Sequence, residues 1–371
     1  MRMKKYLILA LTAAIAAVGC SKTFEVVPSP TDTNPIGFGT WVEHLTKGRT
    51  QGSNTFASGD NFAVYGYKAM SDNSDPHTVF DDVTVSTTNG TTWTYTGTRF
   101  WDANYDKYIF YAVSPASVGT GGTVDPQTGA ITSASITFAG NDNDILVADK
   151  KTVNKTDGSG NFNSWATVPL VFNHVASLVD FKVKKAPGLA NATVTVSAFT
   201  LSEIDNAGVL TVSSAYTDTH PVVSWSTDTR ASYGPGSGVT PVNIESPIPI
   251  EQDTAFDPAN PTTPAGSTFL INNLIVKPQT FRASNGSNPQ KVTMTYKIAV
   301  TGSADVEFAD QVLYLADFDN VDDDAQDDSM IASWEPGKHY TFFITIDAHA
   351  ISFSATITNW TAVNGYHYLV N

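Results

Sequence analysis

Residues 338–358 read KHYTFFITIDAHAISFSATIT, and this stretch decides the fold class. Apolar side chains stand at every second position, with serine and threonine between many of them. These positions are Tyr340, Phe342, Ile344, Ile346, Ile351, Phe353, Ala355 and Ile357. Alternation with a period of two and one polar face is typical of antiparallel sheets that expose one side to water. The stretch therefore predicts a β protein.

The same pattern recurs along the chain. Residues 179–183 and 292–300 alternate in the same way, and each has one apolar and one polar face. Residues 107–113 (KYIFYAV) are instead continuously apolar, which predicts a central strand buried on both faces. Only 15% of the residues are charged, and the exposed faces of helices are usually rich in Glu, Lys and Arg. We expect an all-β chain of many short strands.

The length of the chain predicts two domains. About 350 residues follow the N-terminal signal described below, whereas domains cluster at roughly 100–150 residues. Two groups of strands predict two β-sandwiches in tandem. We place the boundary at Phe172, where one strand pattern runs directly into the next, so that the domains cover residues 36–172 and 173–371. A junction without a linker predicts rigidly joined domains.

The N-terminus has the features of an export signal. Three basic residues (Arg2, Lys4 and Lys5) precede an uncharged, mostly apolar run over residues 6–18. The run is shorter than the roughly 20 residues that span a bilayer, and it has the length of a signal-peptide core. Ala17-Val18-Gly19-Cys20 resembles a lipobox, so we expect residues 1–19 to be removed and Cys20 to carry lipid. Residues 20–35 are polar and proline-rich, which predicts a flexible tether.

The cysteine content and the net charge indicate the compartment and limit the kinds of partner. Cys20 is the only cysteine, so no intramolecular disulfide can form. No aspartate follows it directly, which resembles lipoproteins sent on to the outer membrane. Three of the 21 basic residues lie in the signal, so 18 remain against 36 acidic residues, a net charge of −18. Such a chain repels nucleic acid, and lipid is the expected membrane anchor.

No catalytic or metal-binding motif is present in the sequence. The seven histidines are scattered singly, and no paired-cysteine or nucleophile motif occurs. The segment from Asp317 to Asp328 begins like a calcium loop, but Val321 takes the next ligand position and the loop glycine is missing. A solvated acidic loop is the preferred interpretation, with calcium binding left open. We predict no cofactor, no metal and no enzyme activity.

Several motifs, in a fixed order, resemble the fimbrillin-like lipoproteins, which include the subunits of type V pili. The motifs run from residue 59 to Trp360, which is nearly the whole chain. They are GDNFAVYGY (59–67), WTY (93–95), FW (100–101), YIFYA (108–112) with Pro115, NDILVA (143–148), FNHVASL (172–178), IVKPQ (275–279), and WEPGKHY (334–340) before Trp360. The resemblance implies two transthyretin-like sandwiches and a role in pilus building or adhesion.

In the stalk members of this family, a protease with arginine specificity removes a first strand, and a strand from a neighbouring subunit replaces it. Carried onto this chain, the placeholder strand is residues 36–42, with Ile36, Phe38, Thr40 and Val42 on one face. The cut bond is Arg49-Thr50, and the candidate donor strand at the C-terminus contains Tyr366, Tyr368 and Val370. The implied partners are other fimbrillin-like subunits, with a host receptor or glycan as a further candidate.

Two alternatives stay open. In the first alternative the chain is an uncut anchor, tip or non-pilus relative, and Arg49 is an ordinary loop residue. Only eleven residues follow Trp360, which is short for a donated arm. The second alternative is a surface lipoprotein that binds glycans, with Trp41, Trp165 and Trp225 as the tryptophans that the strand pattern constrains least. Both alternatives place the protein at the cell surface.

Overall fold

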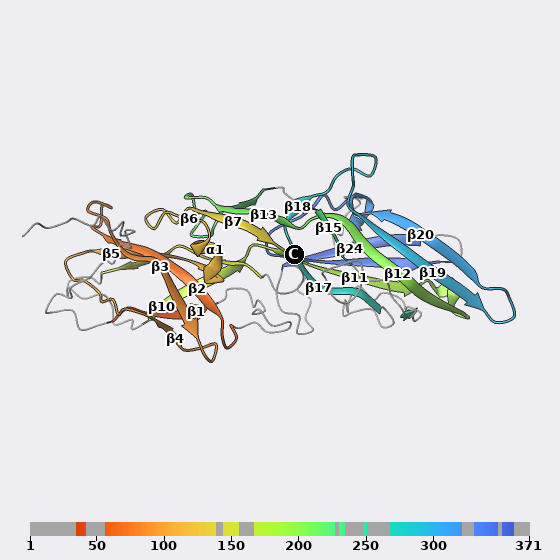
Figure 1. The fold of residues 1–371 in the computed structure, drawn as a ribbon, viewed down its shortest axis with the longest axis horizontal. Coiled ribbons are helices and arrows are strands. Elements are labelled where there is room, and N and C mark those ends of the chain that lie inside the picture. The colour runs from red at the N-terminus through yellow and green to blue at the C-terminus, as the bar shows by residue number, and fades with distance from the viewer. Residues whose placement is uncertain are drawn as a thin grey trace, which may run out of the picture.

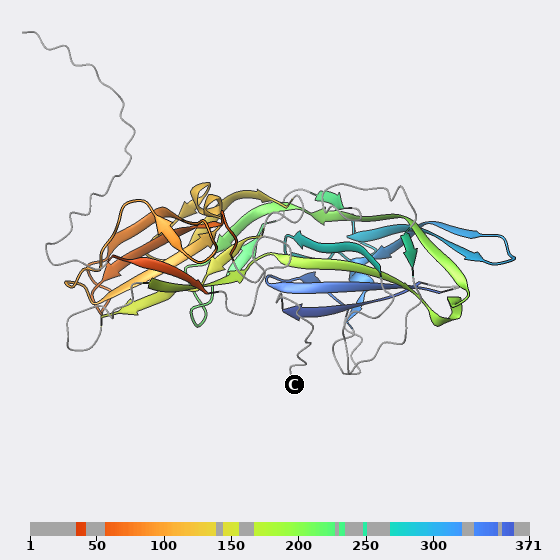
Figure 2. The same cartoon turned by 90° about the horizontal axis from the view of Figure 1, so that it is seen from below.

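The computed structural model describes residues 35–41, 56–138, 144–155, 167–226, 230–233, 248–250, 268–320, 330–347 and 351–359. Most of these residues form strands, which gather into sheets at the two ends of an elongated molecule (Figures 1 and 2). The described helical turns are α1 (Ala116–Thr120), η1 (Pro187–Leu189) and η2 (Leu315–Asp317). None of the described helices has the length and apolar character that crossing a bilayer requires. The predicted all-β class is confirmed.

The sheet at the red and orange end of Figure 1 has eight strands, in the order β1-β10-β8-β5-β2-β3-β4 with β9 beside β5. They are β1 (Gly37–Trp41), β2 (Asn61–Ala69), β3 (His77–Thr87), β4 (Trp93–Tyr95), β5 (Lys107–Ser114), β8 (Leu146–Ala148), β9 (Lys151–Asn154) and β10 (Thr167–His174). As predicted, β5 is buried on both faces. Tyr108 and Phe110 enter one apolar cluster, whereas Ile109 and Tyr111 enter another.

A second sheet at this end covers one face of the first. Its order is β14-β13-β7-β6, with β6 (Thr123–Val124), β7 (Ile131–Thr137), β13 (Ala207–Val212) and β14 (Val223–Trp225). Tyr65 and Tyr111 from the first sheet share a buried cluster with Ile131, Leu210 and Val212 from the second. The apolar residues of these strands alternate, as the sandwich prediction requires.

The other end of the molecule contains two five-stranded sheets. One has the order β17-β11-β23-β24-β21, and the other has the order β15-β12-β19-β20 with β16 beside β12. The bounds are β11 (Ser177–Lys185), β12 (Ala192–Asp205), β15 (Arg230–Tyr233), β16 (Ile248–Ile250), β17 (Thr268–Val276), β19 (Lys291–Val300), β20 (Val306–Tyr314), β21 (Asp319–Asn320), β23 (Lys338–Ile346) and β24 (Ile351–Asn359); β18 (Gln279–Thr280) and β22 (Ser333–Trp334) form a separate ribbon. Their shared core includes Tyr340, Phe342, Ile344 and Ile346, each 1% exposed or less.

Three strand pairs differ from the antiparallel pattern that the sequence predicted. β1 runs parallel to β10, β11 to β23, and β21 to β24. Each pair joins strands that are distant in the sequence, so no tight hairpin fixes their direction. The sheets are therefore mixed, although most pairs are antiparallel.

The predicted boundary at Phe172 stays a prediction, but the described strands cross it. Beyond β12 the chain continues into β13, which pairs with β7 in the N-terminal group of sheets. Phe138 N donates to Asn206 O at 2.6 Å where the crossing begins. The physical reason is burial, because Leu210 and Val212 are 0% and 1% exposed in the cluster that they share with the N-terminal strands. One sheet thus joins residues 123–137 with residues 207–225.

Two of the quoted motifs meet where the two groups of sheets adjoin. Ser177, in the FNHVASL motif, donates through Oγ to Glu335 O at 2.7 Å across 158 residues of sequence. Gly337 N donates to Ala176 O at 2.8 Å. His174 lies in the same motif, and its Nδ1 is 2.8 Å from Asp144 Oδ1, with the two side chains 1% and 3% exposed. These contacts make His174 a structural residue of the junction.

Candidate functional site at the first strand

β1 lies at an edge of the eight-stranded sheet and contacts β4, the strand at the opposite edge. Its parallel register with β10 pairs Phe38 with Val168 and Thr40 with Leu170. Trp93, in β4, donates from Nε1 to Thr40 Oγ1 at 3.1 Å. The sheet therefore curls until its two edge strands meet, and β1 closes the seam between them (Figure 1).

The local sequence explains which face of β1 is buried. Ile36 and Phe38 are 1% and 3% exposed, whereas Gly37 and Gly39, which alternate with them, are partly exposed. Successive side chains of a strand point to opposite faces, so this alternation places both large apolar residues inside. The predicted alternation of Ile36, Phe38 and Thr40 is thus observed as a strand whose Ile36 and Phe38 side chains enter the core.

Phe38 is enclosed by aromatic rings from four other strands. Its ring centroid is 5.2 Å from Phe80, 5.8 Å from Tyr95, 5.8 Å from Phe110 and 6.3 Å from Phe62, each in an edge-to-face arrangement. Edge-to-face pairs add stabilisation beyond the area that they bury. Phe38 is therefore the main side-chain anchor of β1.

Backbone groups hold the start of β1. Tyr95 donates its hydroxyl to Ile36 O at 2.5 Å, and Ile36 N donates to Arg99 O at 2.8 Å. Burial raises the pKa of the Tyr95 hydroxyl still further above neutral pH, so the group is protonated and can donate. These bonds involve only the backbone of β1, so they hold an extended strand of any sequence.

Arg99 supports the wall behind Phe38. Its guanidinium lies 5.0 Å from the Phe80 ring centroid and 5.9 Å from that of Tyr95. Nε donates to Val79 O at 2.7 Å, and Nη1 donates to Gly97 O at 2.6 Å. Burial lowers the pKa of the guanidinium, but an arginine remains charged in proteins. The cation therefore supports Phe80 and Tyr95, two of the four rings that face Phe38.

The structure brings together only part of the predicted site. Ile36, Phe38 and Thr40 share the seam, and Trp41 ends β1. Several predicted residues lie outside the described ranges: Val42, Cys20, Arg49, Thr50, Tyr366, Tyr368 and Val370. In the sequence, Trp93 and Tyr95 are quoted only as part of the WTY motif, which does not connect them with β1.

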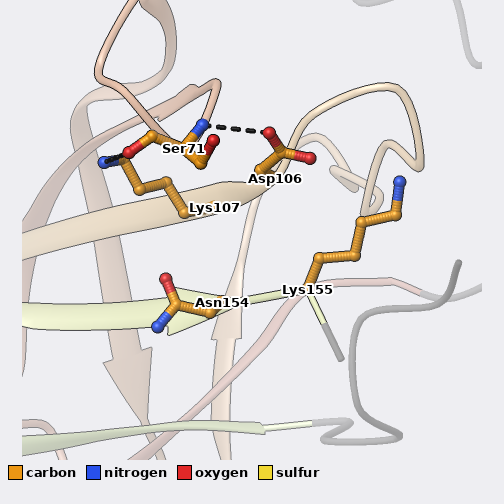
Figure 3. Close-up of a pocket in the computed structure, with 5 residues that line it drawn as sticks. All are labelled: Ser71, Asp106, Lys107, Asn154 and Lys155. Atoms are coloured by element: carbon orange, nitrogen blue, oxygen red, sulfur yellow. Dashed lines mark hydrogen bonds between the residues drawn. The ribbon is translucent and has the colours of Figure 1, made fainter. Parts of the chain in front are cut away.

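A polar hollow of about 440 Å³ lies at the N-terminal end, lined by Ser71, Asp106, Lys107, Asn154 and Lys155 (Figure 3). Lys107 Nζ donates to Ser71 O at 2.9 Å, and Ser71 N donates to Asp106 Oδ2 at 3.0 Å. Lys155 Nζ donates to the carbonyl of Ala103. Both ammonium groups thus bind backbone carbonyls, which favours a role in bracing loops. Within the described ranges, no three His, Cys, Asp or Glu side chains cluster as metal ligands.

Of the tryptophans considered for glycan stacking, Trp225 has its side chain described. Its Nε1 donates to Val175 O at 2.8 Å, and its ring lies 5.4 Å from that of Phe138. The indole is therefore part of the junction between the sheets. Trp165 and the side chain of Trp41 lie outside the described residues.

Comparison with known proteins gives a consistent result. A model of the fimbrillin-like family matches residues 48–360. The fimbrium subunit Fim1C of Phocaeicola vulgatus is 26% identical over 122 residues, a match that spans 31% of this chain and 31% of that protein. The crystal structure of a fimbrial protein from Bacteroides vulgatus has a TM-score of 0.54 and 16% identity, over 88% of this chain and 99% of that chain. At that identity the structural similarity concerns the fold.

Proposed function

This chain belongs to the fimbrillin-like family, and from this premise we propose that it is a structural or adhesive subunit of a type V pilus, assembled by protease-triggered strand exchange. Family membership implies association with other fimbrial subunits at the cell surface. Fimbrillin-like proteins are structural components, so the proposed role is assembly rather than catalysis. The single observation that carries the proposal is the position of β1: an edge strand with two buried side chains, followed at residue 49 by an arginine.

Loss of β1 would leave an open groove. Phe62, Phe80 and Phe110 would lose the ring that they surround, and the segment of β10 that pairs with β1 would become a sheet edge. Unpaired strand edges readily accept a strand from another chain, which supplies both main-chain hydrogen bonds and side chains for the pockets. A strand from a neighbouring subunit is the proposed replacement.

The termini supply the remaining parts of the proposal. Lipid on Cys20 would hold the precursor at the outer membrane until the chain is cut between Arg49 and Thr50. The C-terminal segment with Tyr366, Tyr368 and Val370 is the proposed donor strand for the next subunit. Stalk, anchor and tip subunits differ in which of these steps they use.

Treatment of the purified precursor with an arginine-specific protease tests this proposal. The chain has five arginines, and the side chains of Arg99 and Arg282 are held by bonds to backbone carbonyls. We expect cutting at Arg49, a new N-terminus at Thr50, and complexes of higher mass with itself or with a fimbrial partner subunit. Mass spectrometry and size-exclusion chromatography measure both results.

The matched variants are Arg49→Gln and Arg230→Gln, which remove one candidate cut each. We expect Arg49→Gln to abolish complex formation completely and Arg230→Gln to behave as the unaltered chain. Complete cutting at Arg49 without any complex would contradict strand exchange.

A further inference from the structure

We propose that the groove occupied by β1 selects its incoming strand by two side chains: a large aromatic residue at the place of Phe38 and, two residues later, a hydroxyl that accepts a hydrogen bond from Trp93. This inference rests on the proposed function and deepens it, because it states the chemistry of the partner strand. Trp93 is then the residue that determines specificity. The occupant is a strand of another fimbrial subunit that carries an aromatic-x-Thr or aromatic-x-Ser pattern.

The aromatic requirement follows from the shape of the Phe38 site. Rings from β2, β3, β4 and β5 approach Phe38 edge to face, and the side chain is 3% exposed. A smaller side chain would leave a void that these rings cannot fill without moving. A strand without a large apolar residue at this place therefore loses most of its anchoring.

The hydroxyl requirement follows from the Trp93 indole. Trp93 is 9% exposed, and its Nε1 donates to Thr40 Oγ1 at 3.1 Å. The indole nitrogen is only a donor, so the strand has to bring an acceptor. Valine has nearly the shape of threonine but offers no acceptor, and a site built around a hydrogen bond discriminates strongly against such an analogue.

The other contacts of β1 carry no such information. The backbone of Ile36 accepts a hydrogen bond from the Tyr95 hydroxyl and donates one to Arg99 O, and residues 37–41 pair with the backbone of β10. Any extended strand satisfies these groups. Affinity thus comes largely from the backbone and the aromatic anchor, whereas selection between strands falls to Trp93.

The two side-chain requirements can be applied to the candidate donor strand at the C-terminus of this chain. Placing Tyr368 at the position of Phe38, in the direction of β1, puts Val370 where Thr40 stands. Placing Tyr366 there puts Tyr368 at that position, and its hydroxyl is at the far end of a ring. Neither register supplies the short acceptor, so the groove suits a strand from a different subunit better than a second copy of this chain.

Peptide capture by the full-length Phe38→Ala variant tests the proposal, because its own first strand is weakened. The probes are a labelled peptide of residues 35–41, the same peptide with Thr40→Val, and a peptide of residues 361–371. We expect the Thr40→Val peptide and the C-terminal peptide each to bind about tenfold more weakly than the peptide of residues 35–41, as the loss of a hydrogen bond at a buried donor predicts. In an acceptor that also carries Trp93→Phe, the first two peptides should bind equally.

Equal binding of the unaltered peptide and the Thr40→Val peptide to the acceptor that keeps Trp93 would overturn the inference. If the Phe38→Ala chain does not fold, hydrogen exchange of residues 35–41 in the intact chain gives the same comparison. Thr40 is compared with Thr40→Val, once with Trp93 present and once with Trp93→Phe. Thr40→Val should then raise the equilibrium constant for the opening of β1 about tenfold with Trp93 present, and it should leave this constant unchanged with Trp93→Phe. If complexes form after cutting but the acceptor binds the unaltered peptide and the Thr40→Val peptide equally, only this inference is removed. Clear discrimination without complexes would remove only the protease-triggered exchange.

Discussion

Replacing Phe38 with alanine is expected to lower the free energy of unfolding of the N-terminal sheets by about 3–5 kcal/mol, the usual cost of removing a buried phenylalanine. Phe38 is 3% exposed and touches rings on four strands, so the void would lie at the seam itself. Urea denaturation followed by tryptophan fluorescence measures the loss, since Trp93 and Trp101 belong to the same cluster.

Phe269→Ala is the matched control for this prediction. Phe269 is 38% exposed and its ring lies 4.3 Å from the ammonium of the buried Lys182, so its loss should cost about 1–2 kcal/mol, clearly less than the loss at Phe38. Equal costs for the two substitutions would mean that β1 is not part of the folded core. Under the proposed function, Phe38→Ala should also speed the formation of complexes after cutting at Arg49, because a weakened placeholder leaves its groove sooner.

The seam illustrates how much the sequence can reveal of such a site. The alternation of Ile36, Phe38 and Thr40 with glycine predicted a strand and its inner face, and the structure confirms both. The partnership with Trp93 could not be predicted, because it joins residues 53 apart in the sequence. It depends on the curl of the whole sheet, and no local pattern records that curl.

The crossing strand β13 shows the same limit at the level of topology. Alternating Leu210 and Val212 indicate a strand, but periodicity does not state which sheet that strand joins. Leu210 and Val212 share a buried cluster with Ile131 and Tyr111, and this burial places β13 in the N-terminal group of sheets although it directly follows β12 in the chain. Pairing partners are tertiary information, and the parallel pairs escaped prediction for the same reason.

Replacing His174 with phenylalanine is expected to cost about 3–5 kcal/mol, because it breaks a buried polar pair by removing one partner. The ring nitrogen lies 2.8 Å from Asp144 Oδ1, and the carboxylate is only 3% exposed. Phenylalanine fills the space of the imidazole but leaves Asp144 without the ring nitrogen that contacts it. Thermal and urea unfolding measure the loss, and neutral behaviour would show that the pair does not hold the junction.

The double variant His174→Phe with Asp144→Leu separates the pair from its packing. Replacing both members of a buried polar pair with apolar residues is often neutral, so the double variant should recover most of the loss. Val175 N donates to Ile145 O at 3.0 Å, and this bond joins the same two segments whatever the side chains are. If the double variant regains stability but limited proteolysis now cuts between the two groups of sheets, the pair serves to hold their geometry. Under the proposed function, a strand donated at one end of a subunit has to reach the groove of the next, so such a change should also reduce the length of the complexes formed after cutting.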